Sequence, residues 1–136
     1  MKILVIDAQG GGIGKQLITA IKKKNYLNVT ITAVGTNSVA TGAMLKAGAD
    51  IAATGENPVI VNSRNTDIII GPIGIVIADA LFGEITPEMA KAVAQSTARR
   101  FLLPVNRCDN IIIGVDDLSL SHLIEMTLNE LDRLLA

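Results

Sequence analysis

Four glycines lie close together near the start of the chain, within the stretch "VIDAQGGGIGKQ". A loop of this composition lets the backbone approach a phosphate closely, because glycine has no side chain and adopts positive φ without strain. If a helix begins near Ile13, its N-terminal N–H groups would face the same anion. The pattern therefore predicts a nucleotide-binding loop made of Gln9, Gly10, Gly11, Gly12, Ile13 and Gly14.

Two known motifs compete for this stretch. Against the dinucleotide fingerprint G-x-G-x-x-G, the chain matches two glycines and has Lys15 in third place. It is more similar to the short-chain dehydrogenase form T-G-x-x-x-G-I-G, in which Asp7 replaces the threonine and Ala8 a glycine. The Tyr-x-x-x-Lys motif of that family is missing, because the residue four places after Tyr26 is Thr30. That family's catalytic chemistry therefore does not carry over.

The P-loop G-x-x-x-x-G-K-[ST] is the second motif. Gly14 and Lys15 stand in their places, but Gln9 replaces the first glycine and Gln16 replaces the magnesium-ligating hydroxyl. These departures disfavour a P-loop-like nucleotidase and keep it as an alternative, which magnesium dependence of binding would reveal.

The choice of nucleotide depends on the residues that follow the second apolar run. A dinucleotide site for NAD usually carries an acid about 20 residues after the glycines, where it binds ribose hydroxyls. Residues 34–38 contain no acid. Thr36 and Asn37 could bind a ribose or a 2′-phosphate, and they also suit a helix N-cap. NAD, NADP and a mononucleotide all stay open.

A third candidate element is Gly71-Pro72, which follows the apolar run "DIII". In Rossmann-type folds the loop at this place runs beside the cofactor, and small residues give the cofactor room. We expect Gly71 and Pro72 at the binding site, although a plain turn would also explain them.

Candidate catalytic groups are weaker. Glu84 and Glu88 flank a predicted helix start at Thr86-Pro87, where the helix dipole favours acids, so we assign them that structural role. Asp79 lies in an apolar stretch, where a buried carboxylate is costly unless it is paired.

Another group, Asn106, Arg107 and Cys108, follows a predicted strand, where substrate contacts could lie. A Cys108–His122 nucleophilic pair would require the fold to join two residues that are distant in sequence, and a lone cysteine is usually just a small residue. With one cysteine and one histidine, we expect no metal site.

The elements that must position these residues alternate between strand and helix. Strands are predicted at 2–6, 28–35, 67–71, 101–105 and 110–115, and helices at 13–24, 38–49, 86–99 and 118–135. Residues 50–64 are interpreted as a short strand or loop followed by a short helix or extended segment, and residues 73–82 as a helix. The alternation predicts an α/β fold, a Rossmann-like three-layer sandwich with a mainly parallel sheet of five or six strands.

Composition sets further bounds. The 136 residues suit one domain, residues 1–136, and 49% of them are hydrophobic. A net charge of -1 and only three aromatic residues disfavour a nucleic-acid partner. The longest apolar stretch is broken by Gly, Pro and Asp and falls below the ~18 residues of a membrane span. With no secretion signal at Met1, we expect a cytoplasmic protein.

A homodimer is a further expectation. A helix over residues 73–82 would be apolar on all sides, and such a helix must be buried. We expect this helix or the leucine-rich last helix at the dimer interface.

Taken together, six segments resemble one family: "VIDAQGGGIGKQ", "AVGTNSVATGAMLKAGA", "ATGENPVIVN", "DIIIGPIGIV", "GEITPEMA" and "LPVNRC". It is a family of bacterial proteins of about this length, known as a domain of unknown function. The resemblance covers essentially the whole chain. It implies a Rossmann-like fold and nucleotide binding, and it supplies no catalytic residues.

Three functions remain after the sequence analysis. The first is a nucleotide- or dinucleotide-binding (NAD(P)-type) protein that acts as a sensor or accessory protein. The second is a small NAD(P)-dependent reductase with its active site at a subunit interface. The third is the P-loop-like nucleotidase. The sequence leaves open whether the protein is an enzyme.

Overall fold

A five-stranded parallel sheet forms the centre of the protein in the computed structural model, which describes residues 1–107 and 109–135. The strands are β1 (Lys2–Asp7), β2 (Thr30–Gly35), β3 (Ile51–Thr54), β4 (Ile68–Pro72) and β5 (Arg99–Leu103). Their order in the sheet is β3-β2-β1-β4-β5. This is the Rossmann strand order, so the expected fold class is confirmed.

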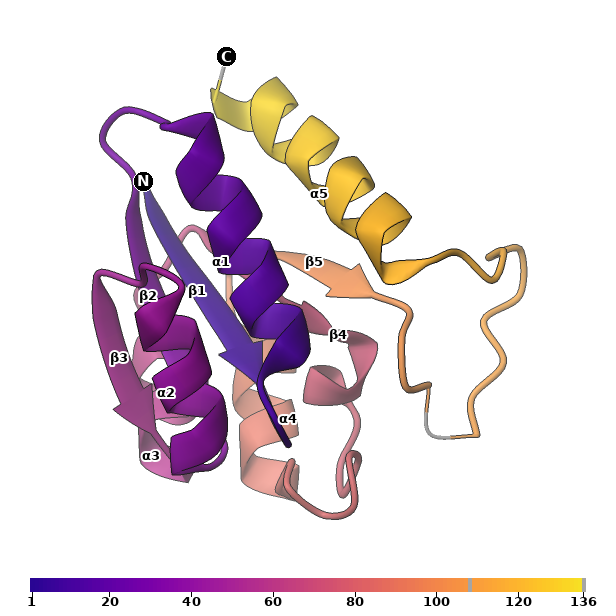
Figure 1. Ribbon diagram of the computed structural model, residues 1–136. Helices are drawn as coiled ribbons and strands as arrows, with labels where there is room; N and C mark the ends of the chain where they lie inside the picture. The colour runs from indigo at the N-terminus through magenta and orange to yellow at the C-terminus, as the bar shows by residue number, and fades with distance from the viewer. Residues whose placement is uncertain (108, 136) are drawn as a thin grey trace.

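Helices cover both faces of the sheet. They are α1 (Gly12–Lys24), α2 (Ser38–Lys46), α3 (Glu56–Ser63), α4 (Pro87–Gln95) and α5 (Leu120–Leu135), with a short 3₁₀ helix, η1 (Ile73–Val76). Figure 1 shows α1, α2 and α5 on one face and α3 and α4 on the other. The three layers follow from right-handed crossovers that change face between β3 and β4.

The central strand β1 explains why its sequence is apolar without alternation. Ile3 and Val5 pack in the core beneath α1, while Leu4 and Ile6 pack in the opposite core beneath α4. All four side chains are fully buried, because helices cover both faces of a parallel sheet.

Two helix starts confirm the predicted capping residues. Of Thr36 and Asn37, it is Asn37 that is the N-cap of α2, and its side chain accepts a hydrogen bond from the N–H of Ala40 at 3.0 Å. Thr86 caps α4 by accepting from the N–H of Met89 at 3.2 Å, with Pro87 at the first helical position. Glu88 lies in the first turn of α4, as expected from the helix dipole.

The prediction of a helix at residues 73–82 is wrong. Only Ile73–Val76 forms a helical turn, after which Asp79, Leu81 and Phe82 adopt positive φ values of 64°, 58° and 58°. β-Branched residues are poor helix formers, and here the apolar side chains are buried by a loop that packs against α4. Asp79 is exposed in this loop. A dimer interface on this segment would therefore involve a loop and not a helix.

The prediction of a strand at residues 110–115 is also wrong. The segment is irregular, and Ile111 and Ile113 are 83% and 89% exposed. Asn106 and Asp109 have positive φ and turn the chain away from the edge of β5. A short apolar run is typical of a buried strand, but this one connects the edge strand to α5.

Among the described residues, no helix combines the length and the apolar character that a membrane span needs.

Candidate functional site

The glycine-rich loop joins the end of β1 to the start of α1. Gln9 and Gly11 both have positive φ, 54° and 75°, which turns the chain sharply from strand to helix. The N–H of Gly11 donates to the carbonyl of Ala8 at 3.0 Å, and the N–H of Lys15 donates to the carbonyl of Gly11 at 2.8 Å. The turn from strand to helix is therefore held by backbone hydrogen bonds within the loop.

The four glycines divide into two pairs. A Cβ on Gly11 would lie 2.7 Å from the Cα of Ala40, and a Cβ on Gly14 would collide with the side chain of Met44. Both residues therefore let α1 pack closely on α2. A Cβ on Gly10 or Gly12 would meet no atom within 4 Å, so these two glycines face open space. Packing explains one pair and does not explain the other.

Asp7 holds the loop from below. Its side chain is 3% exposed, and its carboxylate accepts hydrogen bonds from the N–H of Ala8 at 2.8 Å and the N–H of Gly14 at 2.7 Å. Burial raises the pKa of Asp7, the hydrogen bonds from Gly14 and Ala8 oppose that rise, and the charge of Glu84 adds to it. The acid at the threonine position of the short-chain dehydrogenase pattern thus caps α1.

The N–H groups of the loop are not all satisfied. That of Gly11 bonds to Ala8 and that of Gly14 bonds to Asp7. In the described part of the chain, no protein group accepts a hydrogen bond from the N–H of Gly10 or Gly12. These two donors belong to the same glycines that face open space.

A hollow of about 200 Å³ lies over this loop. It is lined by Asp7 to Ile13, Gln16, Pro72, Leu81, Asn106 and Leu120. A second hollow of about 400 Å³ adjoins it, since Gln9, Leu81 and Asn106 line both. The hollows lie beyond the carboxyl ends of β1 and β4, where the strand order reverses, and ligands of open α/β sheets bind at that place.

Glu84 bridges the loops that follow β1 and β2. Its Oε1 accepts hydrogen bonds from the Oγ1 of Thr36 at 2.6 Å, the Nδ2 of Asn37 at 2.8 Å and the N–H of Gln9 at 2.9 Å. Burial raises the pKa of Glu84, but the hydrogen bonds from Thr36, Gln9 and Asn37 outweigh it and leave the pKa below its ordinary value. Glu84 therefore contacts the loops that follow β1 and β2, and its assignment as a helix-start acid was wrong.

The structure brings most of the predicted site residues together. Gln9, Gly10, Gly11, Gly12, Ile13 and Pro72 all line the hollow over the loop. Thr36 and Asn37 lie beside it, bonded to Glu84. Two predicted residues line neither hollow and have packing roles alone: Gly14 is buried against Met44, and Gly71 lies in β4, where a Cβ would be 2.5 Å from the carbonyl oxygen of Ile6.

The other polar candidates lie in different surroundings. Asn106 lines both hollows, as its position after a strand predicted. Arg107 donates to the carbonyls of Pro104 and Asp116 within its own loop. Cys108 lies outside the described residues, and His122 is exposed on α5. In the part of the chain that the structure describes, no three His, Cys, Asp or Glu side chains are grouped so that they could hold a metal ion.

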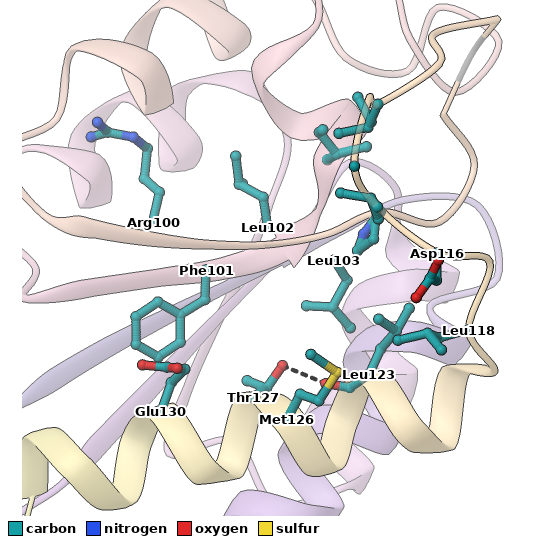
Figure 2. A pocket seen from close by; sticks show the side chains of 15 residues that line it. Arg100, Phe101, Leu102, Leu103, Asp116, Leu118, Leu123, Met126, Thr127 and Glu130 are labelled. Atoms are coloured by element: carbon teal, nitrogen blue, oxygen red, sulfur yellow. Dashed lines mark hydrogen bonds between the residues drawn. The ribbon is translucent and has the colours of Figure 1, made fainter.

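A larger apolar groove of about 590 Å³ lies between β5, α5 and the loop that joins them, and it shares no lining residue with the hollows over the glycine loop. Figure 2 shows Phe101 and Leu103 pointing from β5 towards α5, where Met126 and Thr127 face them. Arg100, Asp116 and Glu130 also line the groove. It follows the edge strand of the sheet.

The strand order and the site beyond β1 and β4 define a Rossmann-like α/β protein. The chain belongs to the family described as Domain of unknown function (DUF3842), whose model matches residues 2–136. This confirms the family resemblance seen in the sequence.

A solved structure with a similar chain is a dodecameric FMN-dependent Ubix-like decarboxylase from Escherichia coli O157:H7. The two chains are 19% identical, the match covers 97% of this chain and 76% of the other, and the TM-score is 0.48. No curated protein is significantly similar to this chain.

Proposed function

We propose that this protein binds a nucleotide at the carboxyl edge of its sheet and acts as a nucleotide-dependent sensor or accessory protein. The ligand's phosphate lies on the loop from Gly10 to Gly12, beside the hollows lined by Pro72 and Asn106. The observation that carries the proposal is the pair of unpartnered N–H groups on Gly10 and Gly12, within the described residues, beside a hollow at the sheet's switch point.

A further consideration supports an anion at this place. The helix dipole of α1 favours negative charge at its N-terminus, and backbone N–H groups there are common phosphate ligands.

The site fits a dinucleotide or mononucleotide better than a P-loop nucleotidase. A P-loop wraps a phosphate with consecutive N–H groups, whereas here the N–H of Gln9 donates to Glu84 and that of Gly14 donates to Asp7. Gln16 replaces the hydroxyl that would ligate magnesium. We therefore expect nucleotide binding to be independent of magnesium.

The test is calorimetric and thermal titration of the wild type and Gly12→Val with NAD, NADP, ADP and ATP. A Cβ at position 12 would meet no atom within 4 Å, so the variant should fold. A nucleotide at about a hundred times its Kd should stabilise the wild type by roughly 2.7 kcal/mol and leave the variant unchanged.

A matched control is Gly42→Val, on an exposed position of α2 where a Cβ also meets no atom within 4 Å. This variant should bind as the wild type does. If none of the four nucleotides stabilises the wild type at millimolar concentration, or if Gly12→Val binds as well as the wild type, the proposal is wrong.

A further inference from the structure

The two carboxylate oxygens of Glu84 have different surroundings. Oε1 accepts three hydrogen bonds, from Thr36, Asn37 and Gln9, so the carboxylate is held in a fixed orientation. Within residues 1–107 and 109–135, no protein group donates to Oε2, and the side chain is partly exposed. One oxygen is therefore anchored and the other can accept a hydrogen bond from a ligand.

The position of this free oxygen is informative. Thr36 directly follows β2, and Gln9 directly follows β1 within the glycine-rich loop. Glu84 therefore stands over the carboxyl ends of these two neighbouring strands. At this place an acid of a dinucleotide-binding fold accepts hydrogen bonds from ribose hydroxyls. Residues 34–38 supply no acid themselves, and the loop before α4 delivers one instead.

We propose that Glu84 accepts a hydrogen bond from a ribose hydroxyl of the bound nucleotide, so that the site selects a ribose with a free 2′-hydroxyl and rejects a 2′-phosphate. This inference rests on the proposed function and specifies its ligand. NAD or an adenosine mononucleotide binds, and NADP binds poorly.

Charge supports the selection. Among the described residues, no lysine or arginine forms a salt bridge with Glu84, whose anchoring donors are a hydroxyl, an amide and a backbone N–H. A 2′-phosphate would place a second negative group against this carboxylate without a cation between them. Juxtaposed like charges suppress binding of the wrong partner, so we expect NAD to bind about 10- to 100-fold more tightly than NADP.

The experiment measures the Kd of the wild type, Glu84→Gln and Glu88→Gln for NAD and NADP by isothermal titration calorimetry. Glutamine keeps an acceptor for the three anchoring donors and removes the charge. The ratio of the two Kd values should fall in Glu84→Gln to within about three-fold, because an amide donor tolerates a phosphate. Glu88 is exposed in the first turn of α4, so Glu88→Gln should keep the wild-type ratio.

A second comparison needs no variant and so does not depend on its folding. The wild type should bind ADP about ten-fold or more tightly than 2′-deoxy-ADP, because the deoxy ligand lacks the hydroxyl that bonds to a charged acceptor. Equal binding of ADP and 2′-deoxy-ADP, or equal binding of NAD and NADP, would overturn the role of Glu84 and leave the proposed function standing. No binding of any of these nucleotides would overturn both.

Discussion

The inner and outer faces of the glycine-rich loop differ in what their glycines do. On the inner face, Gly11 and Gly14 allow α1 to lie against Ala40 and Met44 of α2, and their N–H groups already have protein acceptors. On the outer face, a Cβ on Gly10 or Gly12 would meet no atom within 4 Å, and in the described residues their N–H groups have no acceptor. One face of this short loop therefore needs glycine for packing against α2, whereas packing does not explain the glycines on its other face.

The comparison extends to the two carboxylates that hold the loop. Asp7 lies below it, is buried, and has a raised pKa, whereas Glu84 lies beside it, is partly exposed, and has a lowered pKa. Each carboxylate accepts a hydrogen bond from a backbone N–H of the loop. Asp7 accepts from Gly14, and Glu84 accepts from Gln9. Their opposite shifts show that burial dominates for Asp7 and hydrogen bonding dominates for Glu84.

The largest predicted effect separates the two faces by stability. Gly11→Ala should reduce the free energy of unfolding by about 2–5 kcal/mol, because the residue has φ of +75° and its new Cβ would press on the backbone of Ala40. Gly12→Ala should change it by less than about 1 kcal/mol, since that position is open. Urea denaturation followed by circular dichroism measures both. Similar costs at the two positions would contradict the division between the faces.

A smaller effect is predicted for Asp7→Asn. At neutral pH the variant should lose about 1–3 kcal/mol, because an amide nitrogen would face one of the two backbone N–H groups that the carboxylate now accepts. The pH dependence has a definite sign. A raised folded-state pKa means that the folded protein binds the proton more tightly than the unfolded chain, so the wild type gains stability from this group as pH falls towards 3.8.

The cost of Asp7→Asn should therefore increase as pH is lowered from neutral towards 3.8. Urea denaturation of both proteins at several pH values measures it. A cost that shrinks over this range would show that hydrogen bonding, and not burial, controls the pKa of Asp7.

The smallest effect is predicted for Glu84→Gln. Because its carboxylate is partly exposed and screened by solvent, the variant should lose under about 1 kcal/mol at neutral pH. The lowered pKa gives the opposite sign to Asp7: the stabilisation is complete above pH 4.5 and is lost as pH falls through the folded-state value. The cost of the substitution should therefore shrink below pH 4.5. If the loss of stability in Glu84→Gln instead grows on acidification, the pKa of Glu84 is not lowered and the two carboxylates do not differ in the direction of their shifts.

Local patterns in the sequence were enough to predict the element that carries the loop. The apolar run of β1, the glycines and the helical spacing of α1 are contiguous, and each reports on its immediate neighbours. The alternation of strands and helices then predicted the parallel sheet, and with it the sheet edge at which we propose that a nucleotide binds. Pro72 and Asn106, which also line the hollow, were predicted from their places at the end of one strand and after another.

Long-range contacts were not predictable. Glu84 bonds to Gln9 across 75 residues of sequence, and nothing in its local spacing indicates that partner. The irregular segment before Glu84 was predicted as a helix, because it contains apolar residues such as Ile75 and Leu81. The burial of these residues comes from tertiary packing and not from a helix. The same limit explains residues 110–115, where an apolar run resembles a buried strand but, within the described residues, pairs with no strand of the sheet. Likewise, which glycines pack against the protein and which face open space depends on the position of α2, which the sequence alone does not give.

The most direct test of the central claim is an NMR titration that follows the backbone N–H signals of the four glycines as NAD or ADP is added. The account predicts that the signals of Gly10 and Gly12 shift strongly, since their N–H groups gain a phosphate acceptor, while those of Gly11 and Gly14, already bonded to Ala8 and Asp7, shift little. Unchanged Gly10 and Gly12 signals at saturating nucleotide, or shifts confined to the apolar groove beside β5, would contradict it.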